Sequence, residues 1–180
     1  MSWAWYLLAH DAEAEAKLLA ELKEMLNGRA PDVADLPRLT YTEKVVTETM
    51  RLYPPAWGIG RKALCDFEIG GYYVPAGTQI ALSQWVMHRD PRYFEDPERF
   101  NPDRWTEEFR KRLPKFAYFP FGGGPRVCIG ASFAMLEAVL LLATVAQRYE
   151  IRLVPGHPIK PFPSITLRPK DGIRVVLARR

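Results

Sequence analysis

A glycine-rich loop runs directly into a long apolar segment in the second half of this chain, and this junction constrains the fold more than any other feature. The loop reads Phe121-Gly-Gly-Gly-Pro-Arg-Val-Cys128-Ile-Gly130, and the apolar segment covers residues 131–148. Glycines lack a Cβ atom, so the loop backbone can approach a flat ligand closely. The segment 131–148 is apolar nearly all round, which predicts a helix buried in the core. Its first amides would lie beside Cys128 and could stabilise a thiolate.

The glycines alone leave two simpler interpretations of this loop open. A phosphate-binding loop and a plain buried cysteine both explain a glycine-rich turn before a helix. A phosphate loop would not require Cys128, however, and a zinc site would need more Cys or His ligands close by. Arg126, two residues before the cysteine, adds a permanent cation and favours a thiolate at this position.

The rest of the chain predicts a mixed α and β fold that is mainly α, with small antiparallel sheets, in one domain over residues 1–180. Proline is frequent, with 16 residues, and it favours turns and short strands after residue 52 and again at 155–169. Hydrophobic spacing predicts helices, and turn residues bound the strands. The expected helices are 2–9, 11–27, 40–53 and 131–148; strands are expected within 57–82, an irregular stretch at 90–120, and a hairpin at 165–177.

Composition excludes several classes of function. The net charge is only +4 and no basic face carries interleaved aromatics, so we expect no nucleic-acid partner. Two cysteines do not make a disulfide framework, and Cys65 is expected to be a partly buried thiol without a role. The first residues lack a signal-peptide pattern, and the longest apolar run is too short for a membrane segment. These features predict a soluble, cytoplasmic chain.

A pair of opposite charges lies on the predicted helix 40–53. Thr40 and Glu43 have capping-box spacing at its start, and Pro54 ends it. Glu48 and Arg51 are three residues apart, so they share one helix face and can form an ion pair. A solvated surface pair is the ordinary explanation for such spacing.

The loop at 121–130 resembles the haem-binding signature of the cytochrome P450 family at every defining position. The matching residues are Phe121, Gly124, Arg126, Cys128 and Gly130. The resemblance implies that Cys128 is the axial thiolate ligand of the iron of haem b. It also implies that Arg126 pairs with a haem propionate and that Phe121 packs against the thiolate side of the ring. Gly122, Gly124 and Gly130 would then let the backbone lie along the ring.

Two further segments strengthen the resemblance. Glu48 and Arg51 match the family's Glu-x-x-Arg pair, and residues 100–105 are similar to its Phe-x-Pro-Glu-Arg-Phe segment, with Asp for Glu and Trp for Phe. This implies that Arg104 closes a buried network with Glu48 and Arg51 whose role is structural. Arg61 stands where the family often has a second propionate-binding arginine, although a surface arginine is the alternative.

Two weaker assignments follow from the same resemblance. His88 lies in a recurrent family segment, and a packing and hydrogen-bonding role is expected for it rather than metal ligation. Residues 56–59 would border the substrate pocket.

The family resemblance implies a haem-thiolate monooxygenase that oxidises a small apolar substrate with O2 and two electrons. The electrons would come from a ferredoxin or a flavoprotein reductase. The resemblance spans essentially the whole chain, which is expected to be a C-terminal part of the family fold that starts partway down the distal helix. The oxygen-activating acid and threonine would precede Ser2, so no catalytic residue is assigned, and an apolar patch should be exposed. A haem-binding fragment without turnover and a non-functional truncation are the alternatives.

Overall fold

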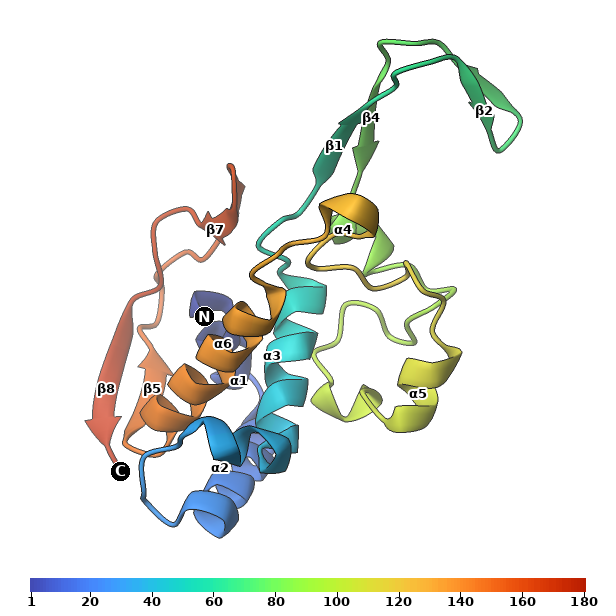
Figure 1. Ribbon diagram of the computed structural model, residues 1–180. Helices are drawn as coiled ribbons and strands as arrows, with labels where there is room; N and C mark the ends of the chain where they lie inside the picture. Colours follow the sequence, from blue (N-terminus) through green and yellow to red (C-terminus); the bar gives the residue numbers. More distant parts are fainter.

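The computed structural model describes residues 1–180 as a helical body with a loop-rich lobe on one side, a β-structure on the other and a projecting hairpin arm (Figure 1). The mixed α and β class with small antiparallel sheets is confirmed. The helices are α1 (Ser2–Leu8), α2 (Ala12–Leu26), α3 (Thr40–Leu52), α4 (Gln84–Met87), α5 (Glu107–Arg112) and α6 (Ala131–Ala146), with 3-10 turns η1 (Val33–Arg38), η2 (Pro102–Arg104) and η3 (Gly124–Arg126). The strands are β1 (Ile59–Lys62), β2 (Phe67–Ile69), β3 (Tyr72–Val74), β4 (Gln79–Leu82), β5 (Tyr149–Leu153), β6 (Pro161–Pro163), β7 (Leu167–Pro169) and β8 (Val175–Arg179).

Helix α2 forms as the sequence predicts and lines the main core. Asp11 caps its first turn by accepting a 2.9 Å hydrogen bond from the backbone N–H of Ala14. Asn27 ends it in the left-handed conformation, with φ at 48°. Leucines one helical turn apart then share a buried face against α1, α3 and α6: Leu18, Leu22 and Leu26.

The N-terminus of α3 is not closed by the predicted Thr40–Glu43 capping box. The N-cap residue is Leu39, which has no side-chain oxygen to accept a hydrogen bond. The carboxylate of Glu21 on α2 takes that role, because it accepts from the backbone N–H of Tyr41 at 2.5 Å and of Thr42 at 2.9 Å. A local spacing rule cannot detect a cap that another helix supplies.

Helix α6 is buried only in its second half, so the prediction of a fully buried helix was wrong for its first two turns. Val139, Leu142 and Ala146 are buried, whereas Phe133 in the first turn is 69% exposed; on the outer face of the second half, Leu141 is still 46% exposed. The expected exposed apolar patch therefore begins on this helix. None of the helices combines the length and the apolarity that crossing a bilayer would require.

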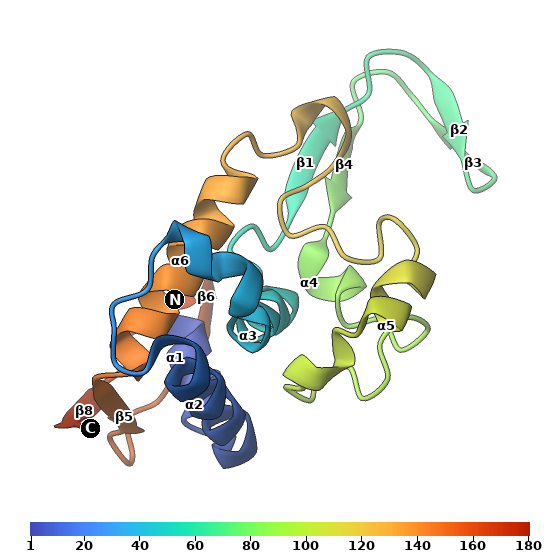
Figure 2. The same ribbon diagram turned by 60° about the horizontal axis from the view of Figure 1, so that its bottom comes forward.

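The strands form four separate two-stranded antiparallel sheets. The pairs β1–β4 and β2–β3 make the arm, whose tip turns at Gly70 and Gly71, both with positive φ. The predicted hairpin at 165–177 does not form. Strand β7 pairs with β6, and β8 pairs with β5, so both strands take earlier segments as partners. Figure 2 shows β5 and β8 at the edge of the molecule opposite the arm.

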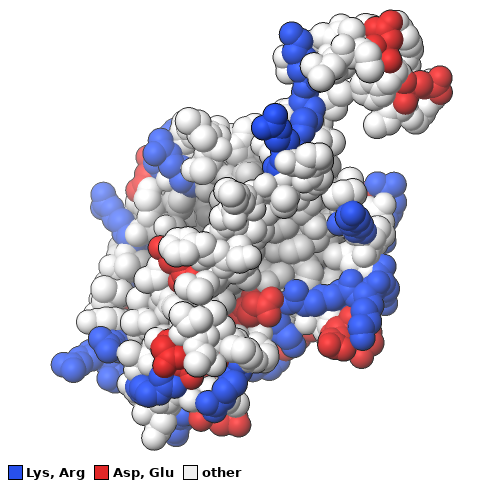
Figure 3. Space-filling model, viewed as in Figure 1, with Lys and Arg blue, Asp and Glu red and all other residues white.

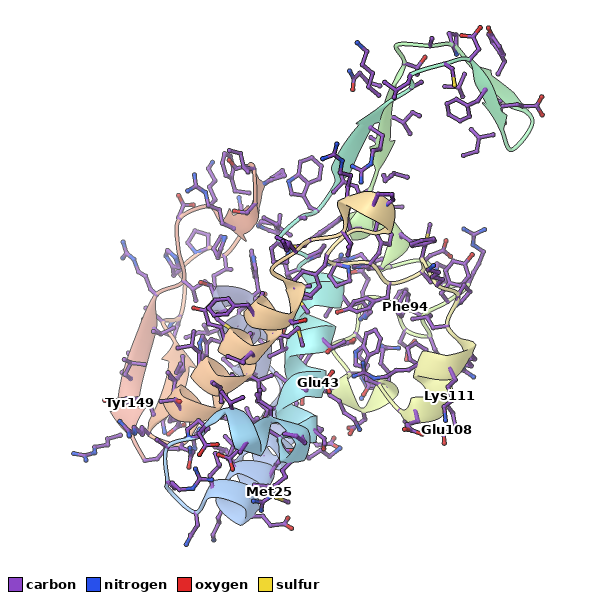
Figure 4. The ribbon with its side chains drawn as sticks, in the orientation of Figure 1. Met25, Glu43, Phe94, Glu108, Lys111 and Tyr149 are labelled. Carbon is purple, nitrogen blue, oxygen red and sulfur yellow. The ribbon has the colours of Figure 1, made fainter.

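The loop-rich lobe around α5 has its own small core. Thr106 caps α5, a helix that the sequence did not predict because the stretch lacks hydrophobic periodicity. Phe94, Trp105 and Phe109 pack together and are at most 7% exposed. In Figure 4 the labelled Phe94 lies within this lobe, whereas Glu108 and Lys111 stand on the outer side of α5. Cys65 lies in the arm rather than in this lobe. It is exposed, so the prediction of a partly buried thiol was wrong.

Candidate functional site

Helix α3 carries a buried ion pair that joins it to the loop-rich lobe. Arg51 donates to both carboxylate oxygens of Glu48, from Nε at 2.9 Å and from Nη2 at 2.8 Å. Both side chains are fully buried. The remaining guanidinium donors reach backbone carbonyls of His88, Pro97 and Arg99 at 2.9, 2.6 and 3.0 Å. Since every charge has several partners, this is the satisfied form of a buried ion pair.

Arg104 and two unforeseen donors complete this network. Arg104 Nε donates to Glu48 Oε1 at 3.0 Å, as the family resemblance implied. The indole of Trp105 donates to Oε2 at 2.9 Å, and the backbone N–H of Asn101 donates to Oε1 at 3.0 Å. The only sequence signal for the Trp105 bond was tryptophan in place of the family's phenylalanine. Nothing in the sequence signals the backbone donor.

The cysteine loop folds back on itself immediately before α6. The N–H of Cys128 donates to the carbonyl of Phe121 at 2.9 Å, which closes residues 121–128 into a ring of backbone. Gly122 and Gly124 have φ of 76° and 68°, a region that other residues enter only with strain. At Gly123 a Cβ atom would lie 2.6 Å from the ring of the exposed Phe116, so a side chain here would have to displace that ring. The fold thus explains three glycines in succession.

Most of the predicted site residues converge on one cavity of about 350 Å³. Predicted residues among its lining are Arg61, Phe121, Gly122, Arg126 and Cys128. Gly124 and Gly130 belong to the same loop but do not line the cavity, although Gly130 provides the N-cap of α6. Figure 3 shows a hollowed, largely uncharged surface below the arm, with Lys and Arg side chains on the arm above it.

Apolar side chains are exposed on both sides of Cys128. The thiol is exposed. Its neighbour Val127 is 54% exposed, and its neighbour Ile129 is fully exposed. Phe133, one turn into α6, is also exposed. A soft sulfur donor, an apolar surface and the two arginines Arg61 and Arg126 are thus grouped together.

A second cavity of about 450 Å³ adjoins the first and is mostly apolar. The two cavities share the lining residues Met50, Pro55, Phe121 and Thr166. Sequence reasoning had placed residues 56–59 at the pocket, and Ala56 and Ile59 do line the smaller cavity. It missed Thr166, which lies more than a hundred residues from Pro55 in sequence and carries no motif. A hydrogen bond of 2.9 Å from Leu167 N–H to the Pro55 carbonyl brings these segments together.

His88 connects the ion network to the start of the cysteine loop. Its ring is fully buried, and Nε2 accepts a 2.9 Å hydrogen bond from the N–H of Phe119. The pKa of His88 is lowered to about 4, mainly by burial and to a smaller extent by the positive charges of Arg51 and Arg89. The neighbouring Tyr118 donates to the Thr47 carbonyl at 3.0 Å, and burial raises its pKa. His88 therefore has the packing and hydrogen-bonding position that the sequence predicted.

Comparison with known proteins identifies the family. The family model for cytochrome P450 matches residues 1–176. A cyclooctatin synthase and a cyclooctat-9-en-7-ol 5-monooxygenase, both from Streptomyces melanosporofaciens, are 47% and 44% identical over 93% and 87% of this chain. The chain spans only 36% and 34% of these two relatives.

Solved structures agree with this assignment. The crystal structure of the cytochrome P450DA heme domain matches 99% of this chain with a TM-score of 0.92 and 32% identity, and the chain covers 40% of it. A second cytochrome P450 structure matches with a TM-score of 0.89 and 31% identity, and the chain covers 41% of it. This chain is therefore a member of the cytochrome P450 family.

Proposed function

We propose that this chain provides the thiolate side of the haem site of a cytochrome P450 monooxygenase. The observation that carries the proposal is the convergence of Cys128, Arg126 and Arg61 on one cavity that Phe121 also lines. Bound there, haem b supplies the activation of O2 and the insertion of one oxygen atom into an organic substrate. The residues of this chain bind and orient the cofactor and limit the access of water.

The donor set suits haem. A thiolate is a soft ligand that binds iron, and the exposed Cys128 places its sulfur just before the N-terminus of α6. The haem propionates are anions, and Arg126 and Arg61 offer two permanent cations in the lining of the same cavity. The exposed apolar side chains of Ile129 and Phe133 supply hydrophobic surface close to the thiol.

The glycine loop explains how a flat cofactor could approach the backbone. Gly122 lines the cavity without a side chain and has the positive φ that other residues rarely adopt. Phe121 lines the same cavity and would pack against the thiolate side of the ring. Gly124 and Gly130 then fix the two ends of the turn that presents Cys128.

A small apolar organic molecule is the proposed substrate class. Ala56, Ile59 and Thr166 line the cavity beside the thiol, and the adjoining cavity is also mostly apolar. Relatives are named as oxygenases of cyclooctat-9-en-7-ol and, in Streptomyces avermitilis at 34% identity, of pentalenene. Turnover would need two electrons from a ferredoxin or a flavoprotein reductase.

The test is a ligand spectrum of the chain itself. Residues 1–180 would be produced with haem supplied, purified, reduced and treated with carbon monoxide, alongside a Cys128→Ser variant. We expect a red-shifted Soret band of the thiolate type that the variant loses. A band of the same position in both proteins would show that Cys128 is not the ligand.

The same preparation separates the proposal from its two alternatives. A monooxygenase gives an oxidised product from an apolar substrate when a reductase and electrons are added. A haem-binding fragment without turnover gives the thiolate spectrum but no product. A non-functional truncation binds no stoichiometric haem.

A further inference from the structure

We propose that His88 is a positioning residue that fixes the cysteine loop relative to the buried Glu48–Arg51 pair. The role concerns the placement of Cys128 and not contact with a ligand. This inference depends on the proposed function only because Cys128, the residue that is positioned, is the proposed iron ligand. The hydrogen bonds that carry it belong to this chain alone.

His88 links two structures that otherwise lie far apart in sequence. Its backbone carbonyl accepts a 2.9 Å hydrogen bond from Arg51 Nη1, which holds the residue against α3. Its ring Nε2 accepts the N–H of Phe119 at 2.9 Å. A neutral imidazole can accept at Nε2 only when its proton is on Nδ1, so this bond also defines the tautomer.

The hydrogen bonds continue from Phe119 into the cysteine loop. The carbonyl of Phe119 accepts the N–H of Gly122 at 2.9 Å, and the carbonyl of Phe121 accepts the N–H of Cys128 at 2.9 Å. Both backbone groups of Phe119 are therefore used, one toward His88 and one toward the glycines. The His88 ring thus fixes the position of Phe119, just before the loop. The hydrogen bond between Cys128 and Phe121 then fixes the position of Cys128.

Packing holds the imidazole in the orientation that this bond needs. The ring lies edge-on to Phe119, with centroids 5.4 Å apart, and is tilted against Tyr118 at 4.9 Å. His88 is 0% exposed and its bond to the half-buried Phe119 N–H is partly shielded, so water has limited access to either group. Loss of the acceptor would leave a partly buried donor unpaired, which is more disruptive than loss of a surface hydrogen bond.

Amide hydrogen exchange of the 180-residue chain tests this role without a cofactor. His88→Phe fills the space but cannot accept, whereas His88→Gln offers Oε1 near the position of Nε2. For His88→Phe we expect exchange at Phe119, Gly122 and Cys128 to accelerate by roughly tenfold or more. His88→Gln should restore most of the protection. The α2 amides report global opening and should change much less.

Tyr118→Phe is the matched control, because it removes a neighbouring buried hydrogen bond but leaves the Phe119 N–H bound. We expect less than about a threefold change at the three loop amides in this variant. The proposal is overturned if His88→Phe leaves these amides at the wild-type rate. It is also overturned if α2 accelerates by the same factor, if His88→Gln exchanges as fast as His88→Phe, or if Tyr118→Phe has the full effect. Failure here would leave the Cys128 spectrum unaffected, so this result and the proposed function can be judged separately.

Discussion

The indole Nε1 of Trp105 donates a 2.9 Å hydrogen bond to Oε2 of Glu48, inside a site where Trp105 is 2% exposed and Glu48 fully buried. The same carboxylate also accepts from Arg51, Arg104 and the backbone of Asn101. One buried anion thus holds together a helix, an arginine of η2 and the irregular chain before it. The loop-rich lobe has little regular structure of its own, so its shape depends on this carboxylate.

Glu48→Gln should therefore destabilise the protein strongly. The glutamine amide has only one acceptor oxygen, and its NH2 group would face N–H donors that now bind the carboxylate. Arg51 and Arg104 would also lose the negative charge that balances theirs. We expect the free energy of unfolding to fall by about 3–5 kcal/mol, measured by urea denaturation. Glu107→Gln is the control, since Glu107 and Lys111 form an exposed ion pair. It should cost less than about 1 kcal/mol, and equal losses in the two variants would contradict the argument.

Glu21→Ala should weaken the start of α3 although Glu21 belongs to α2. The variant removes the acceptor for the N–H groups of Tyr41 and Thr42 and the negative charge near the helix N-terminus. A loss of about 1 kcal/mol in the free energy of unfolding is expected. Glu24→Ala on the same helix is the matched control, because Glu24 is exposed. If both alanine variants lose the same stability, the capping role of Glu21 is wrong.

The elements that the sequence predicted well are those whose signals are local. Helix α2 carries its own N-cap, its own leucine face and its own left-handed stop at Asn27. The arm carries Gly70 and Gly71 at its turn. The cysteine loop is recognisable because its glycines must adopt a backbone that other residues resist, and this requirement is visible in the sequence itself.

The failures share one physical cause, which is that the deciding partner lies elsewhere in the chain. The cap of α3 comes from Glu21, and β8 pairs with β5 across a long connection instead of with β7. The first half of α6 differs from the second by Ser132 and Glu137 but is also mainly apolar, so its composition did not predict that Phe133 would be exposed. Thr166 lines the cavity beside Pro55, to which Leu167 is joined by a backbone hydrogen bond. Hydrophobic spacing cannot report such long-range pairings.

Removing either arginine of the cavity should weaken haem retention. Arg126→Gln and Arg61→Gln each remove one cation that can form a charge-assisted hydrogen bond to a propionate. Such a bond contributes about 1.5–3 kcal/mol, so the apparent affinity for haem should fall roughly tenfold or more. Transfer of haem to an excess of an acceptor protein measures this loss. Arg179→Gln, an exposed arginine on β8, is the control and should retain haem like the wild type. Retention of haem by both cavity variants would exclude the propionate assignment.

Stability should fall in mildly acidic solution because His88 resists protonation in the folded chain. Burial lowers its folded pKa to about 4, against an ordinary value of 6.5. Between these two values the unfolded chain binds more protons, so the free energy of unfolding rises with pH and is fully regained above about pH 6.5. From pH 7 to pH 5 the contribution of His88 should decrease by about 2 kcal/mol, and below pH 4 it should change no further.

Urea denaturation of wild type and His88→Phe between pH 4 and pH 7.5 isolates this contribution. Asp35 and Asp90 have pKa values held low by Arg29 and Arg92, and their stabilising effect is lost only as the pH falls through those low values. Both proteins contain these carboxylates, so their effect cancels in the difference between the two curves. The wild type should lose more stability than the variant between pH 7 and pH 5, because only the wild type has the buried imidazole. Parallel curves would mean that His88 already titrates normally in the folded chain, and its ring could not then be the fixed acceptor for Phe119.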